Sequence, residues 1–282
     1  MGEENRGSAP DSAGGVTTPP APPKGGPSLW LRRLAVRFVL FAVLAGGLGL
    51  LFANLAYNWD WSVVWTYRTL FLLGFKNTIL VSCGAIVLGL VIGLAGGLAR
   101  VSGNIWLEEL ASLYVWIFRG TPLLTQIYIF YFCLAVAVHL DSPFFTGMVA
   151  LAFFSGAYIT EMVRAGIESI SPGQWEAARS TGLSHAQALG LVIFPQAVRR
   201  IIPPVTGQFV SLIKDSSLLS VIAVRELTKS SEMVNAVTYK TFEAYLPLAL
   251  FYLALTYPLT VLTYRLEKRI THQSVLKKGA AT

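Results

Sequence analysis

The chain has 282 residues, of which 54% are hydrophobic and only 13% are charged. A soluble domain of this length needs about twice that share of charged residues to cover its surface. With a mean hydropathy of +0.58, the composition excludes an ordinary soluble domain and favours a membrane protein with several spanning helices. The net charge of +7 comes from Lys and Arg beside apolar runs, which indicates contact with a membrane surface rather than with nucleic acid.

Residues 1–28 are rich in Pro, Gly, Ser and Thr, and such a composition predicts a disordered tail. Six apolar segments follow, each close to the ~20 residues with which a helix crosses a bilayer. They are Leu34–Ala56, Thr78–Ala99, Pro122–Val138, Phe144–Thr160, Ile201–Val224 and Leu246–Tyr264. The third and fourth are short, and the fifth contains polar residues. The sequence therefore predicts an all-α membrane protein with about six transmembrane helices.

The Lys and Arg residues between these segments predict the orientation of the helices, because cytoplasmic loops carry more of them. Sixteen lie on the side of the two termini and five on the opposite side, while Lys214 falls inside the fifth segment. Both termini are therefore expected in the cytoplasm. Trp59, Trp61 and Trp65 follow the first segment, at the place expected for an interfacial aromatic belt.

The cytoplasmic stretch from Ser171 to Arg200 is longer than a simple connection and has helical character. Pro172 suits the start of a first helix, and Gly182 suits the left-handed conformation that ends one. Ser184, with Gln187 three residues later, has the spacing of a capping box for a second helix. Pro195 is expected to end that second helix. The stretch is thus predicted to be a helical hairpin.

The hairpin contains Glu-Ala-Ala, then Gly after three residues, then Val-Ile-Phe-Pro after nine more. This pattern resembles the EAA loop of the permease subunits of bacterial ABC importers, with Val and Phe in place of Ile and Leu. The resemblance implies a coupling helix that docks into a groove of an ATPase subunit. The residues that would carry the coupling are Glu176, Ala177, Ala178, Gly182, Val192 and Pro195. The alternative is an amphipathic interfacial helix that has no partner.

Other segments are similar to the permeases for polar amino acids, the group that serves histidine, glutamine, glutamate and arginine. These segments are Phe118–Gln126, Ala157–Ile167, Lys214–Leu218 and Thr241–Tyr245. The resemblance implies a five-helix permease domain over residues 74–270, with the EAA loop at 171–200. Residues 29–73 would then form an additional N-terminal helix and an outer loop, and residues 271–282 a basic cytoplasmic tail.

The resemblance also implies a set of partners. They are an ABC ATPase dimer, a second permease subunit that is identical or different, an extracytoplasmic solute-binding protein and the lipid bilayer of a bacterial cytoplasmic (inner) membrane. No nucleic acid is expected.

Polar side chains inside spanning helices are costly and are therefore candidates for a substrate path. Glu161 could meet the ammonium group of an amino acid, or it could pair with Arg164 one turn away. Lys214 and Asp215 would be either a gating pair or a structural pair, and Arg119 is expected to extend to the membrane surface. The candidates for the path are Thr121, Gln126, Ser155, Tyr158, Glu161, Lys214, Asp215 and Ser216.

The sequence contains no Gly-x-x-x-x-Gly-Lys-Ser/Thr motif, no Ser-His-Asp set and no cluster of metal ligands. We therefore expect no catalytic residue, metal or cofactor in this chain, and we expect a partner subunit to use the ATP. The alternative function is an ATP-independent secondary transporter, which would predict inverted repeats and broken helices at matched positions. An integral membrane enzyme would need paired acids or histidines at one membrane face.

Overall fold

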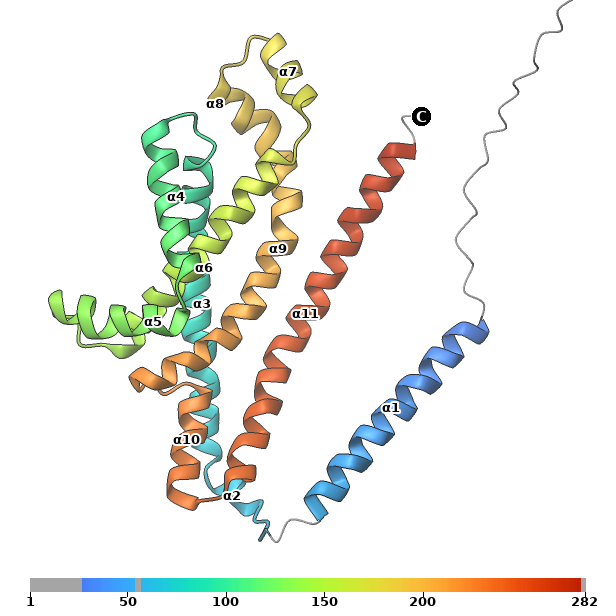
Figure 1. Ribbon diagram of the computed structural model, residues 1–282, viewed down its shortest axis with the longest axis vertical. Coiled ribbons are helices and arrows are strands. Elements are labelled where there is room, and N and C mark those ends of the chain that lie inside the picture. Colours follow the sequence, from blue (N-terminus) through green and yellow to red (C-terminus); the bar gives the residue numbers. More distant parts are fainter. Residues whose placement is uncertain (1–26, 54–56, 280–282) are drawn as a thin grey trace, which may run out of the picture. The chain divides into compact units, whose positions relative to one another are not determined.

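The computed structural model describes residues 27–53 and 57–279, and within these ranges all regular structure is helical. The chain divides into two compact units, Met1–Asn58 and Trp59–Thr282. The described part of the first unit consists mainly of helix α1, Pro27–Ala53 (Figure 1). Its stretch Leu31–Leu50 is long and apolar enough to cross a membrane, and all of its side chains are exposed. Residues 1–26 of the predicted tail lie outside the described residues.

The second unit contains a succession of long helices joined by short helical segments (Figure 1). They are α2 Ser62–Thr66, α3 Arg68–Ala99, α4 Ile105–Gly120, α5 Leu123–Tyr128, the π-helix η1 Ile129–Ala135, α6 Pro143–Glu168, α7 Pro172–Ser180, α8 His185–Ala188, the π-helix η2 Leu189–Ile193, α9 Phe194–Asp215, the 3-10 helix η3 Ser216–Ile222, α10 Leu227–Thr238 and α11 Thr241–Gly279. Helix α11 thus extends through most of the segment predicted as a C-terminal tail.

The number of membrane helices agrees with the prediction. Five helices among the described residues are long and apolar enough to cross a membrane. A sixth crossing results if the bent pair formed by α4 and the segment Leu123–Ala135 counts as one span. The all-α fold of a multi-pass membrane protein is therefore confirmed.

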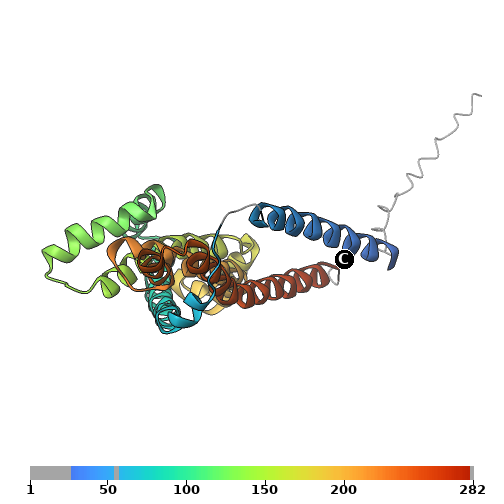
Figure 2. The ribbon, with the colours of Figure 1, turned by 90° about the horizontal axis from the view of Figure 1, so that it is seen from below.

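The third predicted span, Pro122–Val138, has the wrong boundaries. The structure places helix α4 before it, and the segment Leu123–Ala135 is bent from α4 by 107° and projects sideways in both views (Figure 1 and Figure 2). Thr121 and Pro122 have extended backbone conformations at the bend, because a proline disfavours helical geometry at the residue before it. Because α4 contains charged residues, its sequence alone did not identify it as one half of a bent membrane-spanning pair.

The hairpin continues into the next span without a break. Residues His185–Ile222 form one helical stretch, so the prediction that Pro195 ends the second hairpin helix is wrong. The π-helix η2 comes directly before α9, and Pro195 lies in the first turn of α9. An α-helix needs no N–H donor in its first turn, so proline is tolerated there. The span therefore begins well before the predicted Ile201.

Helices α3 and α6 pack closely because α3 presents glycines to α6. A Cβ atom added at Gly93 would lie 2.4 Å from Cβ of Ile159, and one added at Gly97 would lie 2.4 Å from Cβ of Val163. Small residues allow helix backbones to approach in this way within a membrane. Because neither helix can slide past the other without such clashes, we expect α3 and α6 to move as one rigid pair.

Helix α10 lies between the last two spans, in a stretch where the sequence predicts no spanning segment. Glu226 caps its N-terminus and accepts hydrogen bonds from the backbone N–H groups of Thr228 at 2.8 Å and Lys229 at 2.7 Å. It also accepts a hydrogen bond from the hydroxyl of Tyr252 at 2.9 Å. Glu226 is fully buried, and this burial raises its pKa to about 6 although the backbone donors act in the opposite direction.

Candidate functional site

Helices α7 and α8 form the predicted hairpin at one end of the second unit (Figure 1). We call residues 172–188 the coupling hairpin, after the role that the EAA resemblance implies for it. Gly182 has a φ of +84°, which is the left-handed conformation expected after the end of α7. The Ser184 hydroxyl accepts a hydrogen bond from the N–H of Gln187, and the Gln187 side chain accepts one from the N–H of Ser184. The predicted glycine turn and capping box are therefore confirmed.

The residues that carry the EAA resemblance differ in exposure. Ala178 is only 5% exposed, and Val192 is half-buried against the apolar core below the hairpin. The accessible members of the set are Glu176, Ala177, Gly182 and Pro195. Because α7 presents Glu176 and Ala177 to the surface, these two residues can contact a partner, while Ala178 and Val192 hold the hairpin on the membrane helices.

The base of the hairpin is packed against α6 and α9. Trp175 contacts a cluster of buried apolar residues from these helices. The side-chain amide of Gln196 donates a hydrogen bond to Oε1 of Gln174 at 3.0 Å, and the guanidinium of Arg200 donates to the carbonyl of Ser169. Through these contacts a displacement of the hairpin reaches both helices. The cluster comprises Ile159, Val163, Ile167, Ile170, Ile193, Ala197, Ile201 and Val205.

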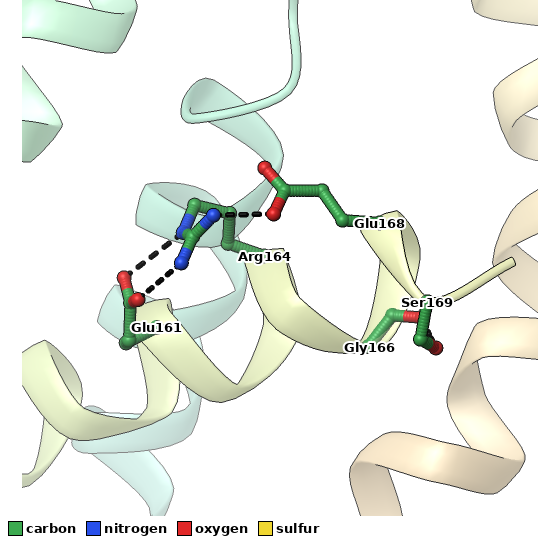
Figure 3. Close-up of polar contacts among 5 residues, drawn as sticks. All are labelled: Glu161, Arg164, Gly166, Glu168 and Ser169. Carbon is green, nitrogen blue, oxygen red and sulfur yellow. Dashed lines mark hydrogen bonds and ion pairs between the residues drawn. The ribbon is translucent and has the colours of Figure 1, made fainter.

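Arg164 lies between two carboxylates on α6 (Figure 3). Its Nε donates to Oε2 of Glu161 at 3.1 Å, and its terminal nitrogens contact Oε1 of Glu161 and Oε2 of Glu168. Of the two roles open to Glu161 from the sequence, the structure forms the internal pair with Arg164. A cation that approached Glu161 would therefore compete with a guanidinium that binds it through two hydrogen bonds.

Glu161 also lines an open pocket of about 510 Å³ together with Arg100 and Arg119. The guanidinium of Arg119, an exposed residue, lies over the ring of Tyr158 at 5.1 Å from its centroid. The Nε of Arg100 is buried and has no hydrogen-bond partner within the described ranges. Because Arg164 already binds Glu161, the two other arginines give the pocket a preference for an anionic group. Ser112, Val115, Trp116 and Gly120 complete its lining.

Four of the other candidate residues have hydrogen bonds within the fold. The buried amide of Gln126 donates to the carbonyl of Phe118 at 2.8 Å and to Oγ1 of Thr121 at 2.9 Å, so Gln126 and Thr121 hold the bend between α4 and α5. The hydroxyls of Ser155 and Ser216, both buried, donate to backbone carbonyls three residues earlier in the chain. These four side chains therefore have partners within the fold, and none of them lines the pocket.

Lys214 and Asp215 lie at the end of α9, the first exposed and the second half-buried. In the part of the chain that the structure describes, the ion pairs lie in α6 and α10, and none joins Lys214 to Asp215. The structural salt bridge offered as one reading of these two residues is thus not formed.

Sequence reasoning missed Arg100 and Arg119 as pocket residues. Arg100 directly follows a spanning helix, and an arginine in that position is usually counted as a cytoplasmic loop residue. A signal was present at Arg119, because the Gly-Thr-Pro sequence that follows it predicts a bend in the chain.

Residues 85–272 match the family model described as "binding-protein-dependent transport system inner membrane component". The chain is 40% identical over 210 residues to the probable glutamine ABC transporter permease protein GlnM of Bacillus subtilis, which covers 74% of this chain and 97% of that protein. It is 37% identical over 216 residues to the glutamine transport system permease protein GlnP of Escherichia coli K12, which covers 76% and 98%. A solved structure, the crystal structure of an amino acid ABC transporter with histidines, has a TM-score of 0.70 at 35% identity and covers 76% of this chain and 100% of that one. The chain therefore belongs to the family of inner membrane components of binding-protein-dependent transport systems.

Proposed function

We propose that this chain is the permease subunit of an amino acid ABC importer and carries a polar amino acid into the cytoplasm. The observation that carries the proposal is the coupling hairpin, which presents Glu176 and Ala177 to the surface above a packed base. The relatives described as glutamine permeases support the class of cargo and make glutamine the first amino acid to test.

In this proposal the transporter contains two permease subunits, an ATPase dimer that binds and hydrolyses the ATP, and an extracytoplasmic binding protein. It lies in the bacterial cytoplasmic membrane, with both termini of this chain in the cytoplasm. The excess of Lys and Arg on the side of the termini supports this orientation. The chain itself contributes no catalytic residue.

Mechanical coupling follows from the packing of the hairpin. When the ATPase subunits move, the exposed face of α7 moves with them, and the apolar base transfers the displacement to α6 and α9. Helix α3 moves together with α6, because the two helices pack so closely at the glycines of α3 that neither can slide past the other. The helices thus tilt as rigid bodies and open the path alternately to each side.

We place the substrate path along the pocket of Arg100, Arg119 and Glu161, with Tyr158 beneath Arg119. The α-carboxylate of the cargo is the group that suits two guanidinium groups. Lys214 and Asp215 remain candidates for a second part of the path, since no salt bridge joins them. Thr121, Gln126, Ser155 and Ser216 lie outside this part of the path and make hydrogen bonds within the fold.

The test is uptake by the complete transporter in vesicles, which contain the permease together with its ATPase and its binding protein. We expect ATP-dependent uptake of glutamine or of another polar amino acid. Uptake restricted to sugars, peptides or metal ions would contradict the proposed function.

A pair of variants tests the pocket. Arg119→Gln should lower amino acid uptake by about tenfold or more, because a hydrogen bond to a charged group contributes ~1.5–3 kcal/mol. Arg225→Gln is the matched control, since Arg225 is an exposed arginine outside the pocket. Equal uptake by the two variants would show that the pocket is not part of the substrate path. It would not contradict the proposal that the chain belongs to an amino acid importer.

A further inference from the structure

We propose that His185 connects the coupling hairpin to the turn between α3 and α4, so that this turn moves with the hairpin during transport. The proposal rests on the function proposed above. It assigns His185 as a positioning residue for coupling, and it adds α4 to the helices that the hairpin drives.

The imidazole of His185 contacts groups from two segments, helix α7 and the turn that follows α3. It stacks on Trp175 of α7, with the ring centroids 5.0 Å apart and the planes inclined by 16°. Its Nδ1 lies 3.5 Å from a terminal nitrogen of Arg179, also on α7. Its Nε2 lies 3.4 Å from the carbonyl oxygen of Val101, in the turn that follows α3.

One tautomer of His185 satisfies both polar contacts. The carbonyl of Val101 can only accept, so Nε2 carries the hydrogen, and the guanidinium of Arg179 can only donate, so Nδ1 accepts. The neutral imidazole with its proton on Nε2 is therefore the form that joins the two segments. The ring stack with Trp175 fixes its orientation.

The turn that receives this contact is stiff enough to transmit a displacement. The hydroxyl of Ser102 donates to the last turn of α3 at 2.8 Å, and Asn104 caps the first turn of α4 at 3.0 Å. The carboxylate of Glu108 accepts a hydrogen bond from the N–H of Gly103 at 2.9 Å. Val101 itself packs against the same apolar cluster as Trp175.

The contact of His185 with this turn affects the pocket of Arg100, Arg119 and Glu161, because α4 and α6 form two of its walls. Glu161 belongs to α6, which leads directly into the hairpin, whereas Ser112, Trp116 and Arg119 belong to α4. Helix α4 ends at Gly120, where the chain bends by 107°. Because His185 contacts the turn that leads into α4 and the chain itself connects the hairpin to α6, a movement of the hairpin displaces the two walls together.

The experiment measures glutamine transported per ATP hydrolysed by the complete transporter in vesicles. His185→Phe keeps an aromatic ring for Trp175 and loses both polar contacts, while His185→Gln keeps a donor and an acceptor and loses the stack. We expect His185→Phe to lower the ratio by about two- to tenfold, the effect of one ordinary hydrogen bond, and His185→Gln to restore most of it. His139→Asn is the control, because His139 is exposed, lies outside the hairpin and has a φ of +53° that Asn tolerates.

The outcomes separate this proposal from the proposed function. A wild-type ratio in His185→Phe, at normal membrane abundance and with normal co-purification of the ATPase, would overturn the role of His185. Absence of amino acid uptake by the wild-type transporter would instead contradict the function.

A covalent link provides a second measurement that does not depend on how His185→Phe folds. Cysteines replace Val101 and His185 in a background in which Cys83 and Cys133 are serine, and a short cleavable thiol cross-linker joins them. If the two segments move together, the link should restore the transport ratio that the loss of His185 lowers. Uptake that stops on cross-linking and returns on cleavage would show that the segments must separate, and would overturn the proposal.

Discussion

Gly182 is the position where a substitution tests the conformation of the coupling hairpin without disturbing its packing. Its φ is +84°, and a Cβ atom added there would have no atom within 4 Å. Replacement by Val therefore brings no crowding, and its cost is that of the left-handed backbone conformation, about 1–2 kcal/mol. A penalty of this size lowers the population of the native turn, and with it the apparent affinity for the ATPase, by a factor of about 5–30.

The assay compares Val, Ala and Asn at position 182 by titration of the ATPase onto the purified permease and by ATP-dependent uptake in vesicles. Asn is the matched control, because it adopts the left-handed conformation more readily than other side chains. We expect affinity and uptake to fall in the order Gly, Asn, Ala, Val, at equal membrane abundance because a Cβ atom at position 182 meets no other atom of the fold. If Gly182→Val and Gly182→Asn bind the ATPase equally well, the left-handed turn is not needed for docking and the reasoning is refuted.

Gly93→Ala should lower the Tm of the purified permease, because the new methyl group meets Ile159 at 2.4 Å and overpacking costs ~1–3 kcal/mol. Gly207→Ala, with no atom within 4 Å, should not, and an equal loss in both would contradict this account. Glu226 has a pKa of about 6 in the folded protein against an ordinary value of 4.5. Its contribution to the free energy of unfolding is therefore greatest below pH 4.5, where the carboxyl is protonated, and is lost as the pH rises through 6. Relative to Glu226→Gln the wild type should lose ~2 kcal/mol across this window, and parallel Tm profiles would disprove it. Reporter fusions at both ends of the chain should report a cytoplasmic location, and a periplasmic signal from either end would exclude the proposed orientation.

The apolar segments were sufficient to predict about how many helices cross the membrane, because a bilayer fixes the length of a spanning helix. The caps of the hairpin were also predictable, since Gly182, Ser184 and Gln187 act through their nearest neighbours in the chain. Pro195 was misread because its effect depends on the preceding π-helix. A proline ends a helix only where its missing N–H and its ring conflict with an existing turn.

Helices α4 and α10 show where apolar content fails as a guide. Helix α4 contains Glu108, Glu109 and Arg119, which lower the mean hydropathy of a segment that nevertheless forms part of a bent membrane pair. Helix α10 is short and polar, and it is stabilised by tertiary contacts of Glu226 with Tyr252 of α11. Such contacts join residues far apart in the sequence, so local patterns cannot reveal them.

The candidate substrate path could not be predicted fully either. A polar residue within a span can stabilise the fold or bind a ligand, and the sequence does not distinguish these two roles. A buried polar group must find hydrogen-bond partners, and most find them within the fold, as the amide nitrogen of Gln126 does with Phe118 and Thr121. A group that serves a ligand is one that the fold leaves with unused donors. By this criterion Arg100, whose Nε has no partner among the residues that the structure describes, is a stronger candidate than Ser155 and Ser216, whose hydroxyls donate to backbone carbonyls. Incomplete hydrogen bonding of this kind, which occurs in the pocket at Nε of Arg100, is a property that only the folded chain possesses.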